Sequence, residues 1–102
     1  MNTLEKIDLC KEYYNKKVRL FFDSKDFVQV RRGITNLIIE GLYPNFQDFF
    51  PYRSAPICFA KADEILEQIR NKEPLNRGLL DEFEAYLAET RLSIFTAHNQ
   101  GN

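Results

Sequence analysis

A run of ten residues, Tyr43-Pro44-Asn45-Phe46-Gln47-Asp48-Phe49-Phe50-Pro51-Tyr52, separates two helical halves of the chain and holds five aromatic side chains. A connection between two packed helices usually needs only about two to eight residues. Each buried Phe or Tyr would remove about 150–250 Å² from water. We therefore expect these rings either to close one end of a helical core or to form a surface for a partner.

On the N-terminal side of this run, apolar residues recur every three or four positions, which is the spacing of one helix face. Asn2 and Glu5 have the spacing of a capping box, so the sequence predicts a first helix over residues 3–22. Residues 23–26 are polar and predict a short turn. The apolar pattern resumes at Phe27 and predicts a second helix.

Two residue types mark special positions in the second helix. Gly33 costs about 1 kcal/mol relative to Ala inside a helix, which suggests that a neighbouring helix approaches closely there. Pro44 is expected to end the helix, because the residue before a proline is disfavoured in the α region. Gly41 is a candidate for the C-terminal break just before it.

On the C-terminal side, Ser54 and Pro56 predict the start of a third helix, since proline is tolerated in the first turn. A loop over residues 71–76 leads to a fourth helix, and residues 98–102 are predicted to form a disordered tail. No stretch alternates with period two, so no strand is expected. The fold class predicted is all-α, an antiparallel four-helix bundle with an aromatic and proline-rich connection between helices 2 and 3.

Composition indicates one small cytoplasmic domain. The 102 residues carry a net charge of −1, with 44% hydrophobic and 28% charged residues, as in ordinary globular proteins. Such a charge gives no global attraction to nucleic acid or to an anionic membrane. The start of the chain does not read as a signal peptide, and no run is long and apolar enough for a membrane span. Cys10 and Cys58 are expected to be free thiols.

Catalytic and metal-binding patterns are missing from the sequence. His98 is the one histidine, whereas a di-iron bundle needs histidines on two helices, and zinc sites need paired Cys or His spacings. We expect no enzyme activity, no metal and no cofactor. One weaker enzymatic alternative remains: Arg91 and His98 resemble the arginine–histidine pair of HEPN ribonucleases, which would imply RNA cleavage with His as base.

The aromatic run favours a small protein-binding module, such as an inhibitor, an immunity-type protein or an adaptor. Aromatic side chains are enriched in interface cores and hot spots. We expect the chain to act as a monomer or homodimer that binds another protein and no membrane. The predicted partner-binding residues are Tyr43, Phe46, Phe49, Phe50 and Tyr52.

An RNA-associated helical domain is the alternative. Its phosphate-binding residues would be Lys16, Lys17, Arg19, Arg31 and Arg32, several of which could meet at one end of the bundle. Binding of this kind depends strongly on salt. The aromatic run leaves the far end of the second helix, about 25 Å away at 1.5 Å per residue. The two sets of residues are therefore not expected to form one site.

Three short segments resemble a known family. Tyr43-Pro44-Asn45-Phe46, Lys61-Ala62 with Leu66–Ile69, and Leu87–Phe95 are similar, in the same order, to the C-terminal helical region of HrpA-type bacterial DEAH-box RNA helicases. Asn45 stands in place of that family's glycine, the spacer before the last segment is shorter, and no helicase motor is present. The resemblance implies an accessory helical module around RNA, with no catalytic residue to carry over.

Overall fold

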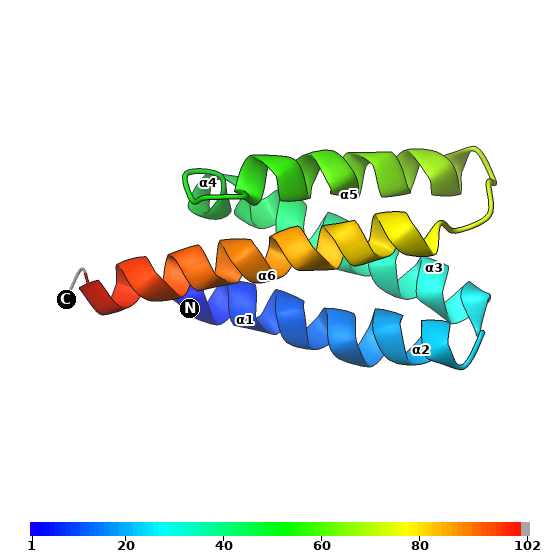
Figure 1. Ribbon diagram of the computed structural model, residues 1–102, viewed down its shortest axis with the longest axis horizontal. Helices are drawn as coiled ribbons and strands as arrows, with labels where there is room; N and C mark the ends of the chain where they lie inside the picture. Colours follow the sequence, from blue (N-terminus) through cyan, green and yellow to red (C-terminus); the bar gives the residue numbers. More distant parts are fainter. Residues whose placement is uncertain (101–102) are drawn as a thin grey trace.

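The computed structural model describes residues 1–100, and every regular element among them is helical. The predicted all-α class is therefore confirmed. Four helical stretches lie lengthwise in a molecule of 44 × 22 × 21 Å (Figure 1).

The first stretch comprises α1 (Thr3–Tyr14), a π-helical segment η1 (Asn15–Arg19) and α2 (Leu20–Asp23). The predicted capping box is present: the Asn2 side chain accepts from the Glu5 N–H at 2.8 Å, and the Glu5 carboxylate accepts from the Asn2 N–H at 2.9 Å. The prediction of a first helix is confirmed to within one residue of its end.

The second stretch begins with α3 (Phe27–Asn36) and continues as the π-helical segment η2 (Leu37–Leu42). The sequence predicts that this helix ends before Pro44, but the helical backbone continues past this residue. Tyr43 keeps an α-region conformation (φ −60°, ψ −43°), and the chain passes into a 3₁₀ turn, η3 (Tyr43–Asn45), and then α4 (Phe46–Phe49). The proline opens this tighter turn, where its missing N–H leaves no partner unsatisfied.

The third and fourth stretches are α5 (Ala55–Arg70) and α6 (Arg77–Gln100). Pro56 lies in the first turn of α5, as predicted. The predicted tail from residue 98 begins too early, because α6 continues to Gln100, and no glycine or proline follows Gly78 within it. Residues 101–102 of that predicted tail lie outside the described residues.

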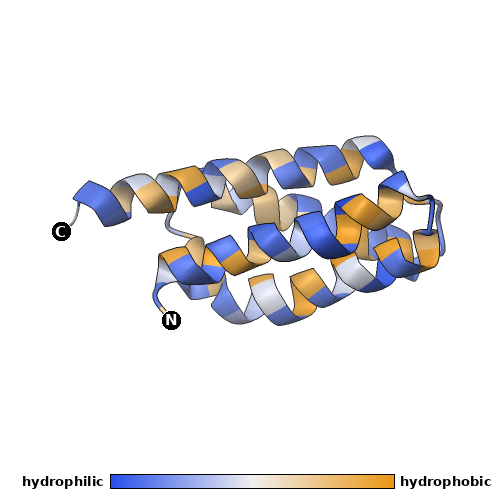
Figure 2. Cartoon of the chain, turned by 90° about the horizontal axis from the view of Figure 1, so that it is seen from below, coloured by the Kyte–Doolittle hydropathy of each residue, from blue (hydrophilic) through white to orange (hydrophobic). Residues whose placement is uncertain are grey.

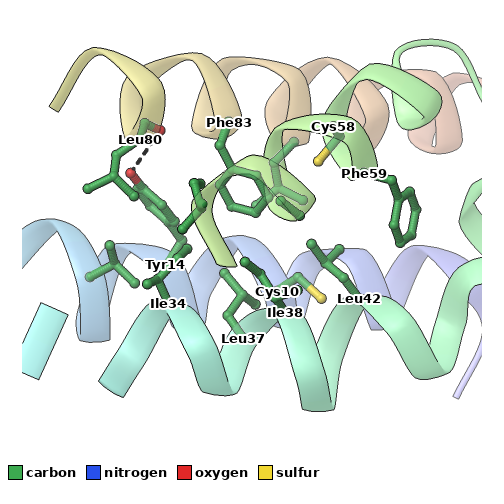
Figure 3. Packing of buried hydrophobic residues seen from close by; sticks show 14 of the residues in the cluster. Cys10, Tyr14, Ile34, Leu37, Ile38, Leu42, Cys58, Phe59, Leu80 and Phe83 are labelled. Atoms are coloured by element: carbon green, nitrogen blue, oxygen red, sulfur yellow. Dashed lines mark hydrogen bonds between the residues drawn. The ribbon is translucent and has the colours of Figure 1, made fainter. Parts of the chain in front are cut away.

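One core joins all four stretches. Its members include Ile7, Tyr14 and Val18 of the first stretch. The Tyr14 hydroxyl donates to the Leu80 carbonyl oxygen at 3.1 Å and so satisfies the one polar group that this ring brings inside (Figure 3). Along each helix in Figure 2 apolar segments alternate with hydrophilic ones, as expected for helices with one buried face.

The contact between the first two stretches confirms the prediction for Gly33. A Cβ atom at this position would stand 2.2 Å from the carbonyl oxygen of Lys17 in η1. Only a glycine allows two helical backbones to come this close. The prediction that Gly41 ends the second helix is wrong, because this residue lies inside η2. A Cβ atom at Gly41 would stand 3.2 Å from Cys10 Sγ.

Candidate functional site

The structure divides the five predicted partner-binding residues into two groups. Phe49 is fully buried in the core, so its assignment to a docking surface is wrong. Tyr52 is partly buried and packs against the same core. Tyr43, Phe46 and Phe50 are 36%, 42% and 40% exposed. Phe46 and Phe50 are four positions apart, and their rings stack on each other at the surface, whereas the Phe49 ring lies in the core.

The exposed rings form a continuous stack with a ring from α5. Phe46 lies 4.6 Å from Phe50 and 4.9 Å, edge to face, from Phe59, measured between ring centroids. Tyr43 stacks on Phe59 at 6.4 Å. These are favourable aromatic geometries. We call Tyr43, Phe46, Phe50 and the buried Phe59 beneath them the aromatic surface.

Phe59 was missed as a site residue by sequence reasoning. Its sequence signal, a place on the apolar face of the third helix, indicates burial only. It contributes by supporting the exposed rings from below, since it is 6% exposed and contacts all three of them.

Polar contacts hold the aromatic surface in place. The Tyr43 hydroxyl donates to Asp63 Oδ1 on α5. Partial burial, and then this bond to a carboxylate, raise the pKa of Tyr43 to about 12, so the phenol stays neutral and donating at physiological pH. The Asn45 side-chain amide donates to the Gly41 carbonyl at 2.8 Å, which fastens the turn before α4. The rings are thus presented on a fixed backbone.

An ion pair joins the segment to the first helix. Lys6 Nζ lies 2.6 Å from Asp48 Oδ2, and both side chains are partly exposed. At the other end of the segment, the Arg53 backbone N–H donates to Ser93 Oγ at 3.3 Å. The aromatic run is therefore attached to α1, α5 and α6, and it is a packed element rather than a loose connection.

The predicted phosphate-binding residues do not all gather as expected. Arg19 pairs with Glu84, Lys16 pairs with Glu12 at 2.8 Å, and Arg31 donates to the Glu73 carbonyl at 3.2 Å. These three cations already have acidic or carbonyl partners within the chain. Lys17 and Arg32 alone of the five line one common hollow, between the first two helical stretches.

The sequence also predicts that the aromatic residues and the basic residues lie at different ends of the second helix. Figure 1 draws α4 in the half of the molecule where α6 ends, and the turn between α2 and α3 at the opposite end. The aromatic surface and the basic residues near that turn therefore form no single site.

The arginine–histidine pair is arranged unlike a free catalytic pair. Arg91 Nε lies 2.7 Å from Asp8 Oδ1 on α1, and its guanidinium stands 4.8 Å above the Phe95 ring centroid. His98 is exposed two turns further along α6. Arg91 thus already has a carboxylate where a substrate phosphate would have to bind.

Within residues 1–100, no three His, Cys, Asp or Glu side chains come together in a way that would hold a metal ion. The described helices also include none with the length and apolarity needed to cross a membrane.

The most enclosed carboxylate is that of Glu84, whose side chain is 14% exposed. Lys11 Nζ lies 3.7 Å from it and Arg19 pairs with it. Two cations beside one largely buried carboxylate make a structural ion cluster between the first helical stretch and α6.

The aromatic surface is the best-defined candidate site, because Arg19, Arg91 and Glu84 already have ion-pair partners within the chain.

Comparison of the chain with protein-family models, with curated proteins and with solved structures finds no match.

Proposed function

We propose that this protein is a small, non-enzymatic protein-binding module that inserts its aromatic surface into an apolar hollow of a partner. The observation that carries the proposal is the group of three large rings, each 36–42% exposed, stacked on Phe59. Exposed aromatic groups of this size are typical of the anchors that supply most of the binding energy in protein interfaces.

The fixed geometry of the rings supports this role. An anchor that is rigid before binding loses little conformational entropy when the complex forms. Phe46 and Phe50 restrain each other, and Asp63 restrains Tyr43. The two prolines at positions 44 and 51 limit the backbone on both sides of α4.

We further infer that the four helical stretches form an antiparallel four-helix bundle, with the aromatic run connecting the second stretch to the third. Short turns support this topology, because residues 24–26 and 71–76 are long enough only to reverse the chain. In such a bundle the partner would meet one end of the molecule.

The test compares three baits in affinity capture from the native host: the wild-type chain, a Phe46→Ser/Phe50→Ser variant and a Phe95→Ser control. Phe95 is a matched control, since it is 37% exposed and lies on α6. We expect a protein to be retained by the wild type and by the control and to be lost with the double variant.

The captured protein is then purified and titrated against each variant by calorimetry. Loss of two hot-spot rings should raise Kd by about 30-fold or more, at about 2 kcal/mol for a hot spot. An equal Kd for the wild type and the double variant would contradict the proposal. Light scattering of the purified chain tests a second copy as the partner, because a dimer lost only in the double variant would identify self-association.

A further inference from the structure

A groove follows the line where the first and second helical stretches meet. Two adjoining hollows, of about 250 and 340 Å³, share Tyr13 and Asn36 as lining residues. Around the first hollow lie Leu9, Cys10 and Leu37. The groove belongs mainly to α1, η1, α3 and η2, with Asn45 of η3 and Phe21 of α2 also lining it, and it does not include Tyr43, Phe46 or Phe50.

Two glycines line the groove, Gly41 in the first hollow and Gly33 in the second. Gly33 allows the backbone of η1 to approach α3 closely, and Gly41 has no side chain to cover Cys10. Their spacing of eight residues corresponds to about 12 Å along a helix. A partner helix of about two to three turns would match this length.

The surface of the groove is apolar at one end. Leu9 is 50% exposed although it stands beside the buried Cys10. Tyr13 packs against the core with its inner side and borders both hollows with the rest of the ring. Leucine and tyrosine side chains in a groove between helices are the usual receptors for the apolar face of an amphipathic helix.

The other end of the groove is cationic. Lys17 and Arg32 are exposed there on opposite walls, and neither has an ion-pair partner among residues 1–100. Glu40 stands at the apolar end, where Lys6 is already paired with Asp48. The positive charge without an ion-pair partner is therefore concentrated at the end of the groove that Lys17 and Arg32 line.

We propose that this groove binds an amphipathic helical segment of another protein, with apolar side chains over Leu9 and Tyr13 and with carboxylates toward Lys17 and Arg32. Electrostatic complementarity fixes the orientation of the bound segment. A nucleic acid would gain two phosphate contacts at the cationic end, but it would leave the apolar floor without a complement. The observations thus favour a protein segment over RNA.

The test selects displayed random 12-residue peptides on the immobilised full chain, with counter-selection on a Lys17→Glu/Arg32→Glu variant. The most enriched peptide is labelled with fluorescein and titrated by anisotropy. We expect it to combine Leu, Met or Phe with Asp or Glu. Its Kd should rise at least tenfold with the charge-reversed variant and with Leu9→Lys.

Matched controls isolate the groove. Lys16→Glu makes the same charge change as Lys17→Glu does, one residue away on η1 and outside the groove, and should change Kd by less than twofold. Phe46→Ser/Phe50→Ser should also leave Kd unchanged, so that this proposal and the proposed function of the aromatic surface can fail separately. The substituted residues of the groove are exposed, and an unchanged melting curve checks that each variant is folded.

Several results would overturn the proposal. These are the absence of any discriminating peptide, a Kd that does not respond to Lys17→Glu/Arg32→Glu, or a peptide that responds to Phe46→Ser/Phe50→Ser instead. Binding of a labelled 12-nucleotide RNA that is lost with the charge-reversed variant, and that no peptide displaces, would assign the groove to nucleic acid. A dimer in light scattering that Leu9→Lys dissociates would assign it to a second copy.

Discussion

Phe46 and Phe49 belong to the same one-turn helix, yet one is 42% exposed and the other is fully buried. The residue type and the local secondary structure are the same, and only the direction around the helix differs. Phe49 points to the core that α1, η2 and α5 enclose, while Phe46 stacks outside on Phe50 and Phe59. This short segment therefore combines an anchor to its own fold with a surface for another molecule.

The sharpest test of this contrast is Phe49→Ala. We expect a loss of about 3–5 kcal/mol in the free energy of unfolding, because the substitution leaves a cavity among buried side chains. Small domains have only about 5–15 kcal/mol in total, so the melting temperature should drop strongly. Urea unfolding followed by circular dichroism measures the change. A loss below about 1 kcal/mol would show that Phe49 is not part of the core.

A second test compares two glycines of the groove. In Gly33→Ala the new methyl group would meet the Lys17 carbonyl oxygen at 2.2 Å, and a backbone atom cannot move aside alone. We expect a cost of about 1–3 kcal/mol, typical of overpacking. Gly41→Ala is the matched control, since its nearest neighbour is the Cys10 side chain at 3.2 Å.

The expected outcome for Gly41→Ala is a smaller change, because the gain of about 1 kcal/mol in helix propensity offsets the crowding. Both variants are measured by urea unfolding. Equal costs for the two substitutions would contradict the close backbone contact at Gly33.

The third test uses pH to probe how closed the interior is around the two buried thiols. Burial raises the pKa of the Cys10 thiol to about 11, and burial together with the neighbouring Cys10 raises that of Cys58 to about 12, from an ordinary value of 9.0. The folded state therefore holds these protons more tightly than the unfolded chain. Stability is complete below pH 9 and falls as pH rises from 9 toward 12.

Between pH 8 and pH 10 we expect a loss of about 1 kcal/mol for each thiol, measured by urea unfolding at each pH. At pH 8 both thiols should react with Ellman's reagent much more slowly in the folded protein than in urea. Rapid reaction of both in the folded state would show that the interior opens readily. Cys10→Ala should reduce the dependence of stability on pH.

The smallest effect is expected for Phe46→Ala. The ring already contacts water, so its removal should cost about 1 kcal/mol or less, mostly from the lost aromatic contacts. Thermal unfolding beside Phe49→Ala measures the difference directly. A cost as large as that of Phe49→Ala would identify Phe46 as a structural residue and would weaken its assignment to a docking surface.

Sequence alone predicted the parts of the fold that depend on local chemistry. The capping box at Asn2 and Glu5, the helix starting near Phe27 and the third helix with Pro56 in its first turn depend on residues a few positions apart. The close approach at Gly33 was also predictable, because a glycine inside a helix is costly unless a neighbour needs the space.

The parts that were wrong depend on contacts between distant segments. Proline at position 44 predicts a helix end, but η2 and η3 carry the chain past it into α4. The pairing of Arg19 with Glu84 on α6 could not be read from spacing, and it removes one predicted phosphate-binding residue. Which faces of α4 point inward depends on where α1 and α5 lie, so the burial of Phe49 was not predictable from its neighbours in sequence.

The pairing of α1 with α6 has a consequence for the connectivity of the chain. All other large contacts join stretches that follow one another, whereas this one joins the first helix to the last. The start of α1 and the end of α6 also lie toward the same end in Figure 1. A circular permutant that links the two ends and opens the exposed loop near Asn71 would make α1 and α6 neighbours along the chain and α5 and α6 the first-to-last pair instead. Because one long-range helix pair replaces another, its folding rate should stay close to that of the original chain.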